Sequence, residues 1–178
     1  MFFVKSKGAL FGLLGSRSTC TILEEFLESP KTEMHAALVQ KRTGLAKKSV
    51  LDGLKKLYAG ALLKRRESAG AIFYSIDGAS AVARELAKVL ALRKVCDAFK
   101  PLDGLAEIYL YGSCARGEAN ESSDLDVLVV TGDRNGVAKI RFGESIKPLI
   151  FSPLEFAALR KVDAPLYQSI MRDRLRVF

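Results

Sequence analysis

The residues best suited to chemistry in this chain are the pair Gly112-Ser113 and two aspartates, Asp124 and Asp126. The apolar run 105–111 predicts a strand that leads into Gly112, followed by a short polar helix and a second apolar strand. Glycine lets a backbone approach a phosphate closely, and the Ser113 hydroxyl and the first free N–H groups of a helix can bind it. Two aspartates spaced two apart on an extended segment leave the sheet on one face, where paired carboxylates suit Mg²⁺.

The string from Gly112 to Asp126 reads Gly-Ser-x-Ala-Arg-Gly, then five residues, then Ser-Asp-x-Asp. It resembles the signature of the minimal nucleotidyltransferases of the DNA polymerase beta superfamily. The resemblance implies a site for a nucleoside triphosphate with Mg²⁺. Its predicted nucleotide-binding residues are Gly112, Ser113, Arg116 and Ser123, and its predicted metal-binding and catalytic residues are Asp124 and Asp126. The alternative is a glycine turn between two strands with a solvated aspartate pair.

Nucleotidyl transfer through two metal ions needs a third carboxylate to hold the second ion. The resemblance places this acid on a later, adjacent strand, for which 145–151 is the candidate. Pro148 lies near the expected position. The carboxylates closest in sequence are Glu144, Glu155 and Asp133, and none fits a strand position facing the aspartate pair. Nucleotide binding is therefore better supported than catalysis, and the chain's status as an enzyme stays open.

Length and composition describe an ordinary globular chain of 178 residues, with 49% hydrophobic and 27% charged residues and room for two small domains. No apolar run approaches the roughly 18 residues of a membrane span, so no membrane partner is expected. Residues 9–14 are expected to be a lead-in segment that packs on a helix rather than a signal peptide. The three cysteines have no close spacing, which disfavours disulfides and zinc and favours a cytoplasmic protein.

The charge is divided unevenly. Residues 1–100 carry 18 Lys/Arg and 9 Asp/Glu, whereas residues 101–178 carry 10 and 11. From Lys41 to Arg66 there are nine basic residues and a single acid, Asp52. A basic block of this kind is either a nucleic-acid footprint or a solvated helix face.

The periodicity around this block predicts three helices and a hairpin. The first helix covers about 19–27, and Thr32 is the expected N-cap of a second helix that carries Met34, Ala37 and Leu38. The third helix covers about 47–58 and is expected to bury Val50, Leu51, Leu54 and Leu57 on one face. Segments 62–67 and 71–76 predict a β-hairpin. The pattern over roughly 16–77 resembles bacterial and archaeal winged helix-turn-helix regulators.

In that arrangement the third helix is the recognition helix and the hairpin is the wing, which approach a groove and the backbone of a nucleic acid. Lysine predominates, which favours attraction to phosphate over reading of bases. The predicted nucleic-acid-binding residues are Lys47, Lys48, Ser49, Lys55, Lys56, Lys64, Arg65 and Arg66. Their partner is DNA or RNA; the alternative is a structural winged helix with a solvated basic face.

Residues 78–100 predict a long helix with a broad apolar face, formed by Val82, Leu86, Val89, Leu90, Leu92, Val95 and Phe99. It is either a spacer packed on both domains or the seam of a homodimer. The tail from Pro153 predicts two short helices that pack on the sheet. His35, the only histidine, lies near a helix start and is expected at the surface or in a cap.

The predicted fold class is α/β (α+β): a winged helix-turn-helix at 1–77, a connecting helix at 78–100, and a nucleotidyltransferase-type mixed sheet with helices at 101–178. The leading hypothesis is a regulator-like, nucleic-acid-binding protein whose second domain binds Mg-nucleoside triphosphate, with transfer of a nucleotidyl group to a protein or small-molecule hydroxyl left open. One alternative is an active small nucleotidyltransferase that modifies a protein or small molecule. The other is a non-enzymatic regulator whose degenerate second domain serves sensing or dimerisation.

Overall fold

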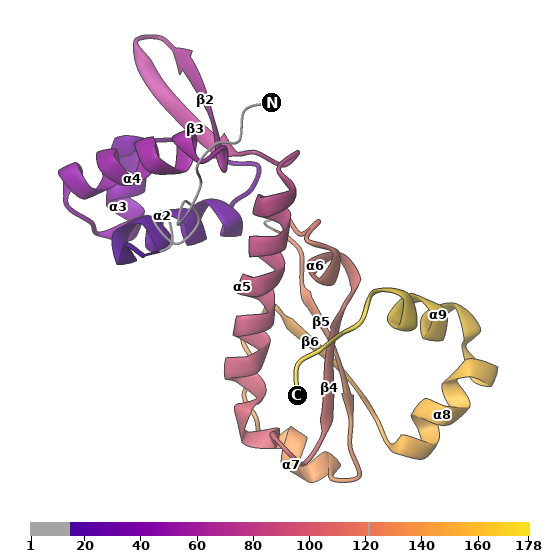
Figure 1. Cartoon of the computed structure of the whole chain (residues 1–178). Coiled ribbons are helices and arrows are strands. Elements are labelled where there is room, and N and C mark those ends of the chain that lie inside the picture. The colour runs from indigo at the N-terminus through magenta and orange to yellow at the C-terminus, as the bar shows by residue number, and fades with distance from the viewer. Residues whose placement is uncertain (1–14, 121) are drawn as a thin grey trace. The chain divides into compact units, whose positions relative to one another are not determined.

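The computed structural model describes residues 15–120 and 122–178, and the chain divides into two units between Ala83 and Arg84. The fold is mixed α and β, as predicted, with one sheet in each unit (Figure 1). The lead-in segment expected at residues 9–14 lies outside the described residues. Among the described helices, none combines the length and the apolar content that a membrane span requires.

The N-terminal unit has the element order of a winged helix. Its elements are α2 (Arg17–Glu28), β1 (Met34–His35), α3 (Ala36–Thr43), α4 (Lys47–Ala59), β2 (Leu63–Ser68) and β3 (Ala71–Ile76). The two long strands form the predicted hairpin, and β1 adds to it in the order β1-β3-β2. Ile22, Phe26 and Leu54 are among the fully or almost fully buried side chains of the three-helix core. Burial of a side chain of this size contributes roughly 1.5–3 kcal/mol.

Two details of this unit differ from the sequence prediction. Thr32 is not the N-cap of the second helix: α3 begins later, and the His35 Nδ1 atom accepts a hydrogen bond from the Leu38 N–H at 3.3 Å. The capping role expected for His35 is thereby confirmed. Leu51 is 39% exposed, and Gly53 is buried in its place. A Cβ atom at Gly53 would lie 2.5 Å from Ile22 Cδ1, so the glycine lets α2 and α4 pack closely.

The C-terminal unit is a four-stranded sheet with helices on both faces. Its elements are α5 (Ala81–Phe99, which begins just before the division), the 3₁₀ turn η1 (Lys100–Leu102), β4 (Glu107–Tyr111), α6 (Gly112–Arg116), β5 (Leu125–Val130), α7 (Arg134–Ala138), β6 (Ile146–Phe151), α8 (Pro153–Val162), α9 (Ala164–Asp173) and β7 (Leu175–Arg176). The strand order is β6-β5-β4-β7, in which β5 and β6 are parallel and the other neighbours are antiparallel. The short edge strand β7 and the helix α7 were not predicted.

Alternation along the strands divides the core of this unit into two layers. On one face, Val95 and Phe99 of α5 pack with Ile108, Leu110 and Val127. On the other face, α8 and α9 cover the sheet (Figure 1) and contribute Leu159 and Ile170 to a cluster with Tyr109, Leu128 and Val130. The predicted long helix therefore packs on the second domain's sheet through part of its apolar stripe. Val82 and Val89 stay 49% and 60% exposed.

Candidate functional site: the start of strand β5

Gly112 positions the site because it lies where β4 gives way to α6. Its φ angle is +75°, a conformation that residues with a side chain adopt at a cost. A Cβ atom at this position would lie 2.6 Å from Asp126 Oδ2. The group that occupies the space beside Gly112 in this structure is the Asp126 carboxylate, and the close approach of a phosphate to Gly112 stays a prediction.

Asp124 lies directly before β5 and is exposed, whereas Asp126 is the second residue of the strand and is half-buried. Partial burial and the negative charge of Asp124 raise the pKa of the Asp126 carboxyl. Two carboxylates that repel one another in this way form a favourable place for a cation. The structure therefore brings the two predicted metal ligands together at one end of the sheet.

Tyr111 is a neighbour of this pair that the sequence did not single out. It is paired with Asp126 across β4 and β5. Burial and the charge of Asp126 raise the pKa of the Tyr111 phenol, so the hydroxyl stays protonated at neutral pH. The tyrosine therefore offers a neutral hydroxyl beside the carboxylate.

Cys114, the variable third residue of the string that begins at Gly112, has a structural role. Its side chain is 4% exposed, and its Sγ atom donates a hydrogen bond to the Asp124 carbonyl oxygen at 3.2 Å. Burial raises the pKa of the thiol, which keeps it protonated and able to donate. The cysteine thereby ties α6 to the backbone that carries the first aspartate.

Arg116 is held by two acids. Its guanidinium pairs with Glu118 at 2.7 Å and with Asp173 of α9 at 2.5 Å, and the Asp173 side chain is only 7% exposed. Hydrogen bonds from Arg172 and Arg116 lower the pKa of Asp173, which keeps this carboxylate charged. In this structure Arg116 connects the helix after the glycine turn to α9; its predicted nucleotide contact stays a prediction.

Ser113 and Ser123 also remain predicted nucleotide-binding residues. The Ser113 carbonyl oxygen accepts a hydrogen bond from the Glu118 N–H at 2.9 Å. The Ser123 hydroxyl oxygen accepts one from the Asn120 N–H, also at 2.9 Å, and so shapes the loop before Asp124.

The strand position beside Asp126 is occupied by a lysine. The parallel register pairs Asp126 with Lys147 and Val127 with Pro148, so Pro148 belongs to the opposite face. Among the described residues, no group of three or more His, Cys, Asp or Glu side chains is placed to hold a metal ion.

None of the three acids considered from the sequence occupies the strand position beside Asp126. Glu155 caps α8 by accepting from the Ser152 N–H and pairs with Arg134, and these contacts lower its pKa to about 2. Asp133 caps α7 by accepting from the Gly136 N–H at 2.9 Å. Glu144 is exposed in the turn that precedes β6.

This donor set fits one divalent cation. Mg²⁺ is bound by one or two protein carboxylates, and water and substrate phosphates complete its shell. Asp124 and Asp126 supply that number, and Gly112 leaves room for the second of them. A second cation has no comparable ligands on the neighbouring strand.

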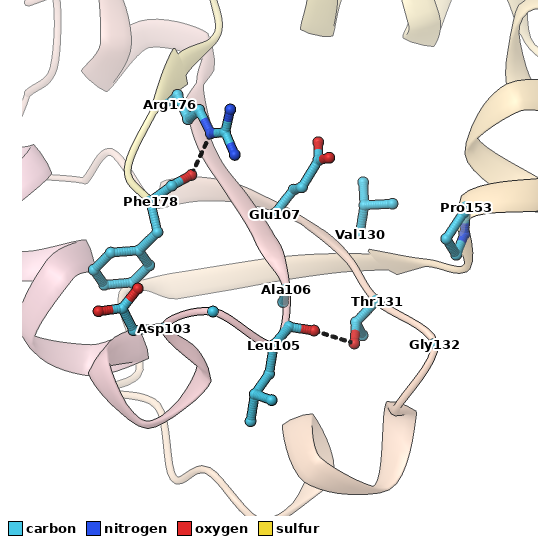
Figure 2. A pocket seen from close by; sticks show the side chains of 11 residues that line it. Asp103, Leu105, Ala106, Glu107, Val130, Thr131, Gly132, Pro153, Arg176 and Phe178 are labelled. Carbon is cyan, nitrogen blue, oxygen red and sulfur yellow. Dashed lines mark hydrogen bonds between the residues drawn. The ribbon is translucent and has the colours of Figure 1, made fainter.

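A cavity of about 540 Å³ lies at the opposite end of the same sheet (Figure 2). Its lining includes Glu107, which begins β4, and Thr131, which follows β5 and donates a hydrogen bond to the Leu105 carbonyl oxygen. The aspartate pair lies at the other end of both strands, where Tyr111 pairs with Asp126. The cavity is therefore separate from the Gly112–Asp126 motif.

The predicted nucleic-acid-binding residues lie on α4 and the hairpin, and all except the half-buried Ser49 are exposed. On the wing, each cation has an acid: Lys64 pairs with Asp77 at 2.9 Å, Arg65 lies 3.9 Å from Glu67, and Arg66 pairs with Glu33 at 2.5 Å. The α4 lysines differ, because within the described part of the chain none of them has an ion-pair partner. They are Lys47, Lys48, Lys55 and Lys56.

Comparison with known proteins places a family on the C-terminal half. Residues 92–167 match the family model described as "Nucleotidyltransferase domain", the same part of the chain that carries the Gly112–Asp126 motif. A comparison with curated proteins gave no match.

Solved structures similar to this chain fall into two groups. NolR from Sinorhizobium fredii is 23% identical over 47% of this chain and 79% of its own, with a TM-score of 0.40. The homodimeric winged helix-turn-helix DNA-binding domain of Mb0332 from Mycobacterium bovis is 21% identical over 53% and 92%, with a TM-score of 0.37. A proposed nucleotidyltransferase from Sulfolobus solfataricus is 17% identical over 56% and 89%, with a TM-score of 0.38.

Proposed function

We propose that this chain is a nucleic-acid-binding regulator whose C-terminal domain binds a nucleoside triphosphate together with one Mg²⁺. The observation that carries the nucleotide half is the pair Asp124 and Asp126 at the start of β5, beside a glycine whose missing side chain makes room for one of them. The nucleotidyltransferase match over 92–167 supports the same assignment.

The nucleic-acid half rests on α4. Four exposed lysines of one helix, free of ion pairs among the described residues, present positive charge with Asp52 as the one acid on α4. Phosphate groups are the natural partners of such a surface, because binding releases the counterions that surround a nucleic acid. We assign duplex DNA as the ligand of this surface, since a recognition helix followed by a wing fits a groove and the adjacent backbone.

Binding without transfer is favoured over full catalysis. Activation of an attacking hydroxyl at neutral pH needs more than one cation held by two aspartates. The neighbouring strand offers Lys147 in register with Asp126, and a cation there repels a second metal ion. The enzymatic alternative requires a third acid from outside strand β6, and the candidate is Glu144 in the turn before that strand.

Calorimetric titration of ATP, GTP, CTP and UTP with Mg²⁺ tests the nucleotide half. We expect wild type to bind at least one of them and the Asp124→Asn, Asp126→Asn double variant to bind none, because neutral amides are poor Mg²⁺ ligands. Equal affinity in the two proteins would remove the site from this position. Titration of duplex DNA into both proteins provides the matched control, since the substitutions leave α4 unchanged.

A further inference from the structure

One row of side chains crosses three strands at the candidate site. Tyr111 of β4 pairs with Asp126 of β5, which pairs with Lys147 of β6. Side chains that are neighbours in register lie on the same face of a sheet, and the faces alternate along each strand. Two residues further along β5 and β6, Leu128 and Leu149 pack in the same cluster, which confirms that the row faces the side of α8 and α9.

Lys147 is exposed at the end of this face. Leu149 and Phe151 of the same strand are partly buried against the α8–α9 layer, but the lysine lies before them and outside the cluster. Among the described residues, no carboxylate lies within ion-pair distance of its ammonium group, not even that of its neighbour Asp126. The positive charge of Lys147 thus lies beside the pair Asp124 and Asp126 without forming an ion pair with either aspartate.

We propose that Lys147 binds the triphosphate directly, in the place where a third carboxylate would otherwise hold a second cation. The proposal rests on the proposed function and names how that site recognises its ligand. An ammonium group is a compact charge with three donors on a flexible stem, well suited to phosphate oxygens. The site then takes its nucleotide with a single divalent cation, and it favours triphosphates over monophosphates because the lysine contacts the outer phosphates.

Neutral and conservative substitutions test the contact. With the nucleoside triphosphate that binds wild type and with inorganic triphosphate, Lys147→Ala is expected to lose about tenfold or more in affinity, the size of one charge-assisted hydrogen bond. The corresponding monophosphate should be affected much less, and Lys147→Arg should retain most of the affinity. Lys139→Ala, which removes an exposed lysine after α7, is the matched control. Unchanged triphosphate affinity in Lys147→Ala would overturn the proposal.

Charge reversal gives a second, independent readout. Lys147→Glu places a third carboxylate in register with Asp126, so the number of Mn²⁺ ions bound in the presence of inorganic triphosphate, counted by electron paramagnetic resonance, should rise from one to two. A count that stays at one would contradict the proposed position of the lysine. Circular dichroism establishes that the variant is folded.

The outcomes separate the two proposals. If wild type binds a triphosphate and the aspartate double variant does not, but Lys147→Ala binds as wild type does, the inference about Lys147 fails and the proposed function stands. If wild type binds none of the nucleotides and no inorganic triphosphate, both fail.

Discussion

The residues proposed to bind nucleic acid and nucleotide are arranged in opposite ways in the two units. In the N-terminal unit, positive charge is spread over seven exposed lysine and arginine side chains of α4 and the hairpin. In the C-terminal unit, the candidate site depends on a few atoms: a glycine with positive φ, two carboxylates and a lysine in register with one of them. A surface of distributed charge tolerates single substitutions, whereas a site built on close approach does not.

The wing and α4 also differ in how their cations are held: those of the wing have protein partners, and those of α4 have none within the described part of the chain. Arg66 donates to both carboxylate oxygens of Glu33, and its guanidinium lies 5.4 Å from the centre of the Phe73 ring. A phosphate must compete with these contacts before it gains the arginine. The lysines of α4 have no such competitor among the described residues.

The largest effect is expected from removing the α4 charge as a whole. Replacing Lys47, Lys48, Lys55 and Lys56 with Ala should weaken duplex DNA binding at low salt by about a hundredfold or more and make the log–log salt slope shallower by about 3 to 4, because up to four phosphate contacts are lost. Fluorescence anisotropy at several salt concentrations measures both quantities.

The wing supplies the control for that experiment. Replacing Lys64, Arg65 and Arg66 with Ala should change the slope by less per residue, since each cation must first leave its acid. Glu33→Gln should strengthen binding slightly by freeing Arg66. A wing variant with the larger slope change per residue would reverse the assignment of the two surfaces.

The next effect concerns one glycine from each unit. Gly117 has φ +71°, and a Cβ atom there would lie 2.6 Å from the backbone carbonyl oxygen of Arg84 in α5. Gly117→Ala should therefore lower the unfolding free energy of the C-terminal unit by about 2 kcal/mol or more, since both the backbone conformation and the packing must change. Gly53→Ala meets only the end of the flexible Ile22 side chain, and the better helix propensity of alanine offsets part of the strain by up to about 1 kcal/mol.

Hydrogen exchange at increasing urea concentration measures the unfolding free energy of each unit within one chain, when it is resolved for the amides of β5 and of α4. Gly143→Ala, at a position where a Cβ atom would meet nothing within 4 Å, is the control for the C-terminal unit. An equal loss of unfolding free energy in Gly53→Ala and Gly117→Ala would contradict this prediction. It would mean that a Cβ contact with a side chain costs as much as one with the backbone.

The same contrast explains which features the sequence could predict. The α4 helix and the hairpin follow from helical spacing, turn residues and alternation, which are local. The glycine–aspartate string is also local, and its two glycines are needed where their positions suggest. Leu51 was assigned to the buried face because it is apolar, but Gly53 takes the contact with Ile22 instead.

The role proposed for Lys147 depends on long-range strand pairing. The strand reads Ile-Lys-Pro-Leu-Ile-Phe, with apolar residues on both faces, so its pattern does not set the register against β5. A shift of one residue moves every side chain to the other face. Pro148 was considered from the sequence, and only the parallel pairing shows that its neighbour Lys147 shares a face with Asp126.

The smallest expected effect compares two exposed acids, one from each unit. Hydrogen bonds from the Ser152 backbone and side chain and from Arg134 lower the pKa of Glu155 to about 2, below its ordinary 4.5. Glu33 is shifted in the same direction, chiefly by its hydrogen bonds from Arg66. A carboxyl with a lowered pKa in the folded state stabilises above its unfolded pKa, and the contribution disappears as the pH falls.

Stability from Glu155 should accordingly be complete above about pH 5 and be lost progressively as the pH falls toward about 2. Glu155→Gln should flatten the pH dependence of the melting temperature of the C-terminal unit over this range. Glu33→Gln should do the same to a smaller extent in the N-terminal unit. Among the described residues, Glu33 accepts hydrogen bonds from Arg66 alone, whereas Glu155 takes part in a capping box with Ser152 and also pairs with Arg134. Both differences should shrink at high salt, since the groups are exposed and screened. If Glu33→Gln flattened the profile as much as Glu155→Gln does, the helix cap would contribute nothing beyond the ion pair.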